Sequence, residues 1–300
     1  MLKRIRKKVL THLPLINSGG VVIATFMVFT MGVVVINAQT FMTHVFYDER
    51  AFYQMPQEIS VSPELIYGSG IVPHHIVASE MIHELLLNLP KDIKTIYLIG
   101  PNHTEEGITI QTSNVNWKTM FGNIEVDQDK VVSLIRNGSV ANEPIRLASD
   151  QSVAALTDYI AYHLPNVKVV PIILKAGISL ELMSGLVDEL EFNAEGSFFL
   201  VSTDFSHYLE YENALKHDQV TYGVLKFGSV EDVRGMNSDF LDSDSAIMVL
   251  KMLNERLGLT YMRLLAHSTN YDITKSASDY TNITSYFTVL YSKMFNNENE

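Results

Sequence analysis

The chain has 300 residues, of which 47% are hydrophobic and 19% charged, an ordinary globular composition with enough apolar material for a sizeable core. It contains no cysteine, which excludes disulfides, thiolate metal sites and cysteine nucleophiles. The formal net charge of −12 argues against a nucleic-acid partner, because phosphate binding needs a basic face, and an acidic surface that keeps the protein in solution is the simpler interpretation.

The amino terminus differs in composition from the rest of the chain. It begins with a basic cluster, KRIRKK, and no further charged residue follows until Asp48. Within that gap, residues 19–36 are apolar except for two threonines, and a helix of this length just spans a hydrocarbon core of about 30 Å. By the positive-inside rule we expect a cytoplasmic basic segment at residues 1–18 and a transmembrane anchor at residues 19–38. The predicted localisation is the cell membrane, single-pass, with the soluble domain on the extracytoplasmic side.

Two alternatives compete with a retained anchor. A cleaved signal peptide would also begin with basic residues, and Ile36-Asn37-Ala38 is a passable cleavage site, but a signal peptide usually has a shorter apolar region. A buried core helix is disfavoured because no polar residue marks an outward face. After the anchor we expect a polar tether at residues 39–63, a folded domain at residues 64–294 and a polar tail at residues 295–300.

From residue 64 onward, short apolar strands alternate with amphipathic helices. The expected strands are Leu65–Val72, Lys94–Gly100, a weak Thr109–Thr112, Val167–Leu174, Ser197–Ser202, Tyr261–Ala266 and Ile283–Tyr291. The expected helices are Val77–Leu89, Asp127–Arg136, Asp150–His163, Leu180–Leu190, Glu210–Phe227 and Ser245–Leu257. This alternation predicts a single three-layer α/β domain with a mostly parallel sheet. No GxGxxG, P-loop or GxSxG motif is present, so nucleotide binding and α/β-hydrolase chemistry lose their usual sequence support.

Histidines follow three of the predicted strands, at the edge where open α/β sheets bind ligands. His74 follows the first strand, with His75 indistinguishable by position, and His103 follows the second. Asp204 and His207 follow the strand that ends at Ser202. A lone loop histidine usually hydrogen-bonds to backbone, and Asp204 could simply cap a turn. The joint occurrence at one sheet edge favours a functional site.

Carboxylates also precede the helix that begins at Ser245, in Asp242-Ser243-Asp244. An N-cap explains this run by itself, and Asp150 likewise is expected to cap a helix. Alternatively, Asp242 joins the histidines in a metal site. Imidazole and carboxylate together suit Zn, Fe, Mn or Cu, and two histidines with one carboxylate form the facial triad of non-haem Fe(II) enzymes. A nucleophilic Ser206 with His207 and Asp204 is disfavoured, because residues this close in one loop rarely reach triad geometry.

The chain resembles the Memo-like proteins, specifically the bacterial form called AmmeMemoRadiSam system protein B. The resemblance covers nearly all of residues 64–292, and the ordered set of motifs is specific although each motif alone is weak. The matching segments are IVPHH at 71–75, IGPNH at 99–103, VPIIL at 170–174, TDFSHY at 203–208, HD at 217–218, LDS at 241–243 and TSY at 284–286. The family is similar in structure to class III extradiol dioxygenases, which are non-haem Fe(II) enzymes.

The resemblance implies a ligand set by position. His74 and His103 match the two family histidines, and Asp242 stands where many members have a cysteine ligand, so these three residues would hold one divalent metal. Fe(II) is favoured, with Zn or Cu as alternatives. Asp204 and His207 match the family's Asp–His pair and would transfer protons or orient a ligand. Gln151 stands where members often have histidine, which puts dioxygenase-like catalysis in question.

Both the third ligand and the function stay open at this point. We expect the strands before His74 and His103 to lie side by side, since successive strands usually do, so that their loops converge. If Asp242 only caps its helix, His75 or His207 would complete the site instead. Whichever ligands form the site, three functions stay open. The protein is a metal-dependent redox enzyme acting on a small molecule, a metal-binding or interaction module without turnover, or a zinc-dependent hydrolase.

Overall fold

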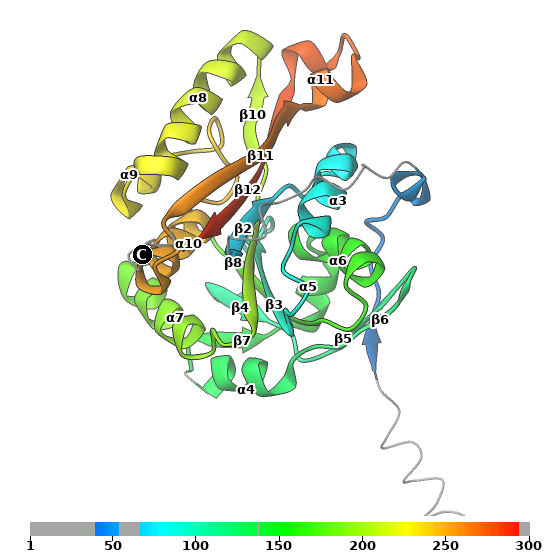
Figure 1. Cartoon of the computed structure of the whole chain (residues 1–300), viewed down its shortest axis with the longest axis vertical. Coiled ribbons are helices and arrows are strands. Elements are labelled where there is room, and N and C mark those ends of the chain that lie inside the picture. The colour runs from blue at the N-terminus through cyan, green and yellow to red at the C-terminus, as the bar shows by residue number, and fades with distance from the viewer. Residues whose placement is uncertain (1–39, 54–66, 137, 294–300) are drawn as a thin grey trace, which may run out of the picture. The chain divides into compact units, whose positions relative to one another are not determined.

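A nine-stranded sheet runs through the part of the chain that the computed structural model describes, which is residues 40–53, 67–136 and 138–293 (Figure 1). The strands lie in the order β10–β12–β2–β9–β3–β8–β4–β7, and β11 also pairs with β12. Their bounds are β2 (Tyr67–Val72), β3 (Thr95–Pro101), β4 (Ile110–Thr112), β7 (Val140–Asn142), β8 (Lys168–Leu174), β9 (Ser197–Ser202), β10 (Phe205–Leu209), β11 (Tyr261–Thr269) and β12 (Ile283–Ser292).

The centre of the sheet is parallel and buried on both faces. Strands β2, β9, β3 and β8 pair in parallel, and every residue of β3 is buried. Strands covered on both faces read as continuous apolar runs, which is why the sequence predicts them well. The predicted strand Ser197–Ser202 is confirmed residue for residue as β9.

The sheet as a whole is mixed, which corrects the expected mostly parallel arrangement. Strand β12 runs antiparallel to β2, β10 and β11, and β4 runs antiparallel to β8. Strand direction depends on how the connections travel across the fold, and the apolar pattern of a single strand does not encode it.

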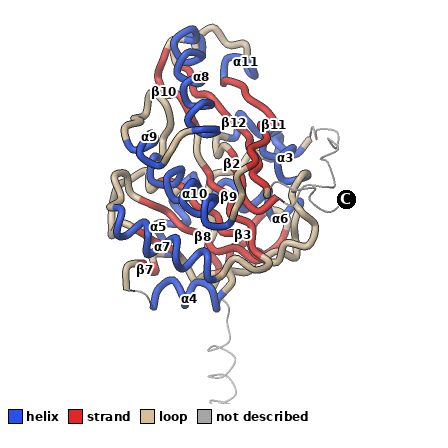
Figure 2. Tube along the Cα trace, turned by 60° about the vertical axis from the view of Figure 1, so that its left-hand side comes forward, coloured by secondary structure: helices blue, strands red, loops and turns tan. Residues whose placement is uncertain are grey.

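Helices cover both faces of the sheet, as predicted. Helices α3 and α6 contact each other on one face, and α7 and α10 contact each other on the other (Figure 1). Figure 2 shows the red strands between blue helices from a second direction. The helix bounds are α3 (Ser79–Leu87), α4 (Gln128–Arg136), α5 (Pro144–Ser149), α6 (Gln151–His163), α7 (Leu180–Phe192), α8 (Tyr211–Phe227), α9 (Val230–Arg234), α10 (Asp244–Leu257) and α11 (Asn270–Thr274), with short 3₁₀ helices η1 (Glu49–Phe52), η2 (Ile76–Ala78) and η3 (Asp279–Thr281).

Part of the predicted tether packs on the domain. Strand β1 (Phe41–Met42) pairs with β5 (Asn116–Thr119), which pairs with β6 (Gly122–Ile124) in a separate three-stranded sheet. The side chain of Met42 is buried, and His83 Nε2 lies 2.9 Å from the carbonyl oxygen of Ala51. Residues 41–52 therefore belong to the compact α/β unit, whereas residues 54–63 lie outside the described part.

The predicted membrane localisation is corrected. No helix within residues 40–53, 67–136 and 138–293 is long and apolar enough to cross a bilayer. The longest of them, α8, has 17 residues and carries several charged side chains, whereas a span needs about 20 apolar residues. The segments 1–18, 19–38 and 295–300 lie outside the described residues. The single-pass assignment with an extracytoplasmic domain is therefore not retained.

Gly100 permits a close approach between β3 and α6. A methyl group at this position would lie 2.6 Å from Ser152 Cβ and 2.5 Å from Ser152 Oγ. We expect Gly100→Ala to lower the free energy of unfolding by about 1–3 kcal/mol through overpacking, measured by urea denaturation. Gly185→Ala in α7 is the control, because nothing lies within 4 Å of its added methyl group, and it should stabilise by about 0.5–1 kcal/mol. Equal stability of Gly100→Ala and the wild type would contradict the close approach.

Candidate metal centre

The predicted histidines meet at the carboxyl edge of the parallel strands. His74 follows β2 and His103 follows β3, and their ring centroids are 5.1 Å apart. The expected reason for this convergence is wrong, because β9 lies between β2 and β3. The residues that follow β9, Thr203 and Asp204, therefore lie between the two histidine loops and become part of the same site.

Asp242 joins the two histidines from a third loop. Its Oδ2 atom lies 3.4 Å from His74 Nε2 and 3.8 Å from His103 Nε2. One ligand atom from each of these three side chains lies within 4.8 Å of the other two, which is the spacing a single metal ion needs. Among the described residues, this is the one group of three or more such side chains with that spacing.

The hydrogen bonds of His74 fix which of its nitrogens faces the site. Ser202 Oγ donates its hydrogen to the carbonyl oxygen of Ser152, so it can only accept from His74 Nδ1, 3.1 Å away. His74 Nε2 is therefore left with a lone pair directed at Asp242. Burial lowers the pKa of His74 to about 4, and the neutral imidazole is the form that binds metals.

His103 has the same orientation but a different environment. Asp150 Oδ1 lies 2.8 Å from His103 Nδ1, and Asp150 Oδ2 accepts from the His103 backbone N–H at 2.9 Å. Burial alone would lower the pKa of His103, but Asp150 and the charge of Asp242 outweigh burial and raise that pKa to about 10. The side chain of His103 is 42% exposed, whereas those of His74 and Asp242 are buried or nearly so, so the site opens to solvent beside His103.

Asp242 is not the cap of its helix. The N-cap of α10 is Ser243, whose side chain accepts from the backbone N–H of Ala246. Asp242 is instead held by β10, because its backbone N–H donates to Asp204 O at 3.2 Å and the neighbouring Leu241 bridges to Phe205. Thr203 Oγ1 donates to Asp242 Oδ1, while Asp242 Oδ2 is buried without a hydrogen-bond partner.

This donor set fits a divalent cation. Asp242 Oδ2 and His74 Nε2 both present lone pairs to each other at 3.4 Å, a contact that is repulsive unless a positive charge lies between them. The pKa of His103 rises for the same reason, since the neighbouring carboxylates favour a positive charge on this imidazole. A buried carboxylate oxygen without a partner is costly, and a metal ion would satisfy it together with both imidazoles.

Asp204 and His207 lie beside these ligand atoms. Asp204 Oδ1 accepts from the His74 backbone N–H at 3.1 Å, and Asp204 Oδ2 lies 3.7 Å from His74 Nε2. Burial and the charge of Asp242 raise the pKa of Asp204 to about 7. His207 acts electrostatically on both carboxylates, lowering their pKa values, and its Nδ1 is buried without a hydrogen-bond partner. Asp204 therefore lies in contact with a predicted ligand, and His207 is near enough to influence both carboxylates.

Several contacts of the site are not apparent from the sequence. Asp150 caps α6 as predicted, accepting from the Ser152 N–H, but it also holds His103. Ser202 holds His74 and Thr203 holds Asp242; Thr203 begins the TDFSHY segment, but none of the quoted motifs contains Ser202. Gln151 Nε2 donates to the His74 carbonyl oxygen at 3.3 Å, so Gln151 borders the site. His75 Nδ1 lies 2.6 Å from the Tyr286 hydroxyl and is not part of the ligand group.

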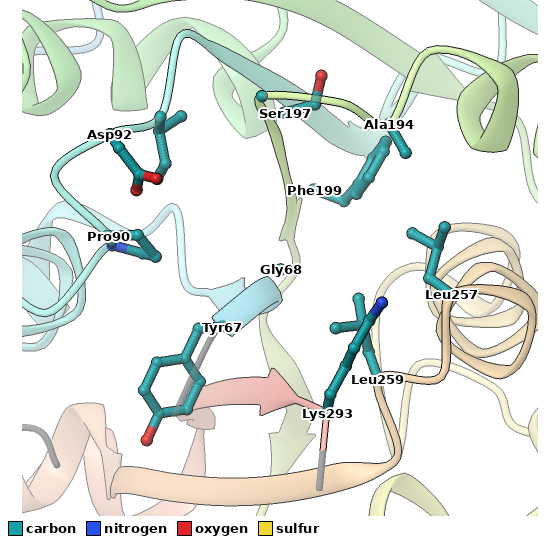
Figure 3. Close-up of a pocket in the computed structure, with 12 residues that line it drawn as sticks. Tyr67, Gly68, Pro90, Asp92, Ala194, Ser197, Phe199, Leu257, Leu259 and Lys293 are labelled. Carbon is teal, nitrogen blue, oxygen red and sulfur yellow. The ribbon is translucent and has the colours of Figure 1, made fainter. Parts of the chain in front are cut away.

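A hollow of about 250 Å³ lies at the opposite end of the parallel strands (Figure 3). It is bordered by Tyr67 and Ser197, the first residues of β2 and β9, and by Leu257 at the end of α10. Figure 3 shows Lys293 and Asp92 at its rim and Phe199 on its wall. None of the predicted site residues borders it, so the candidate chemistry lies at the other end of the strands.

Comparison with known proteins identifies the family. The Memo-like protein family matches residues 56–288 of this chain. A MEMO1 family protein of Methanococcus maripaludis strain C6 is 27% identical over 260 residues, covering 81% of this chain and 86% of the relative. A MEMO1 family protein of Caldivirga maquilingensis is 26% identical over 220 residues, covering 68% of this chain and 77% of the relative.

Among solved structures, an uncharacterized protein, JW3007 from Escherichia coli K12, aligns with 74% of this chain and 99% of its own, at a TM-score of 0.48 and 10% identity, too remote to carry an argument. The family match is much stronger evidence than this structural alignment, because it spans well over half of the sequence and contains every residue of the candidate metal centre. This chain belongs to the Memo-like protein family.

Proposed function

We propose that this protein binds one divalent metal ion through His74, His103 and Asp242 and uses it in a redox reaction of the dioxygenase type on a small molecule. The observation that carries the proposal is the buried, unpartnered Oδ2 of Asp242, which faces two imidazole nitrogens. Two histidines and one carboxylate leave coordination positions open for substrate, and Fe(II) is the metal most often used in this way. Bound in this set, Fe(II) would supply oxygen activation.

The remaining residues of the site have roles that follow from their contacts. Asp150 and Ser202 orient the two imidazoles through their Nδ1 atoms, so that both Nε2 atoms point at the same place. Asp204 and His207 would take a proton from a substrate hydroxyl and return it to a product. The exposed side of His103 gives the substrate access.

The test of this proposal is metal analysis of the full chain after anaerobic expression and purification. We expect close to one equivalent of Fe(II), which should be removed by chelation and restored by added iron. Oxygen uptake with a panel of catechols then tests the redox reaction. Preparations that bind no divalent metal would refute the proposal, and metal binding without oxygen uptake would favour a metal-binding module.

A zinc-dependent hydrolase is the second candidate, because the same donors suit zinc and Gln151 replaces the histidine that relatives often have. The distinction lies in the metal itself, since zinc has no redox chemistry. Zinc in the anaerobic preparation, with ester hydrolysis that zinc alone restores to the chelated protein, would support this alternative.

Asp150→Asn is expected to weaken metal binding without unfolding the protein. Asparagine is as good an N-cap as aspartate, so α6 keeps its cap, but the negative charge that makes His103 a stronger ligand is lost. Removal of such an orienting partner typically costs about 10–100-fold in metal affinity, measurable by competition with a chromophoric chelator. Unchanged affinity would show that Asp150 serves the helix alone. Ser179→Asn, at the N-cap of α7 and outside the site, is the matched control.

A further inference from the structure

Asp218 is a buried carboxylate that the proposed chemistry does not use. It belongs to α8, and it is 2% exposed. Asp218 Oδ1 accepts from Ser206 Oγ at 2.7 Å and from Ser285 Oγ at 2.6 Å. A carboxylate only accepts, so His267 Nε2 donates to Asp218 Oδ2, 2.7 Å away. Asp218 therefore ties β10, β12 and β11 to α8 through their side chains.

Stability alone does not account for this carboxylate. Removing its charge from water costs free energy that the three bonds only offset, and an apolar side chain would pack between the helix and the strands without that cost. A fully bonded polar network instead fixes one arrangement of the segments that it joins. Asp218 thus acts through the position in which it holds its partners, and Ser206 is the partner that leads to the metal centre.

Ser206 lies at an irregular position of β10. The residues on either side of it, Phe205 and His207, pair with consecutive residues of β12, so Ser206 is an extra residue in the ladder. Such bulges re-aim the side chains around them and are frequent beside functional sites. The bond from Ser206 to Asp218 holds the extra residue in place, and with it the backbone that carries His207.

The backbone of Ser206 connects this bond to a metal ligand. Its N–H donates to Phe240 O at 3.1 Å, and in the same ladder the Asp242 N–H donates to Asp204 O at 3.2 Å. Ser206 thus bonds to Asp218 through its hydroxyl and to the segment that carries Asp242 through its amide. The N-cap of α10 lies one residue after Asp242, so this segment depends on β10 rather than on the helix cap for its position.

We propose that Asp218 is a positioning residue of the metal centre, which acts through Ser206 to set the place of β10 and thereby of Asp242. This inference rests on the proposed metal binding and adds a residue outside the ligand group. Asp218 bonds to Ser206, Ser285 and His267, so its effect on the metal passes through the backbone of β10.

The test is titration of the metal-free full chain with Co(II), whose visible absorption depends on the arrangement of its ligands. Ser206→Ala breaks the bond to Asp218 with little change in volume. We expect it to raise the Kd for Co(II) by about tenfold, the low end of what an orienting partner contributes, because Thr203 still holds the Asp242 carboxylate. The Co(II) absorption spectrum should change as well, since the ligand moves.

Two further variants make this result specific. Ser69→Ala is the matched control, because it also removes a buried strand hydroxyl, one that donates to Asn254 Oδ1 and joins β2 to α10. Its Kd and spectrum should equal those of the wild type, although its melting temperature should fall as in Ser206→Ala. Asp218→Asn retains an amide oxygen that can accept from both hydroxyls, so its Kd should stay within about threefold of the wild type.

The outcomes separate this inference from the proposed function. If the wild type binds no Co(II), Fe(II) or zinc, the metal-dependent function fails and the role of Asp218 fails with it. If the wild type binds Co(II) and Ser206→Ala has the same Kd and spectrum, the role of Asp218 alone is refuted. Equal losses of affinity in Ser206→Ala and Ser69→Ala would also refute it, because any loss of stability would then weaken metal binding. A loss in Asp218→Asn as large as in Ser206→Ala would overturn it too, since the Ser206 bond would not be the means.

Discussion

Replacing Asp242 with alanine is expected to lower metal affinity by at least about 100-fold, more than the loss of an orienting partner typically costs. The carboxylate supplies one of three ligand atoms and the only full negative charge among them. The fold should survive, because Asp242 raises the pKa of the buried Asp204 through like-charge repulsion that the substitution removes. Metal content is measured after dialysis against the ion, and folding by circular dichroism.

The matched control is Asp244→Ala, two residues further along. Asp244 begins α10, and its Oδ1 accepts from the Ser245 backbone N–H, so it contacts the helix and not the ligand atoms. Its loss should cost some helix stability and no metal. Full metal occupancy in Asp242→Ala would mean that the third ligand is another side chain and that the carboxylate has a structural role.

Replacing His207 with glutamine is expected to leave metal content unchanged and to reduce turnover by about 10²–10⁴-fold, the usual contribution of a positioned acid or base. His207 lies outside the ligand group, yet its proximity lowers the pKa values of both Asp204 and Asp242. Its Nδ1 is buried without a hydrogen-bond partner, so a substrate hydroxyl bound at this centre would satisfy it. Asp204→Asn should have a similar effect, because the amide can no longer take up a proton.

His217→Gln is the matched histidine control. His217 Nδ1 contacts the Asp239 carbonyl oxygen at 3.1 Å, and its ring stacks on Phe240, so it is anchored away from the ligand atoms. Both metal content and turnover should be preserved in this variant. If His207→Gln instead loses the metal while His74→Gln retains it, the assigned roles of the two histidines are reversed.

The sequence by itself determined the strands and helices that have a clear pattern of apolar residues along their own length. Strands β3, β8 and β9 are continuous apolar runs because helices cover both of their faces, and the apolar residues of α7 recur at helical spacing, which identifies it without any partner. Short elements such as β10 were not predicted. Only two residues separate the end of β9 from the start of β10, and β10 is a strand because it pairs with β12 on one edge and with the Asp242 segment on the other.

The sequence also named the three candidate ligands, but the tertiary structure decided how they come together. Histidines at strand ends and a resemblance to a family are enough to name His74, His103 and Asp242. Their convergence depends on β9 lying between β2 and β3, on Ser243 rather than Asp242 capping α10, and on β10 drawing Asp242 towards Asp204. The strand order and the contact between Asp204 and Asp242 join segments far apart along the chain. Local patterns carry no information about such partners, because the free energy that selects them comes from burial and pairing in the complete fold.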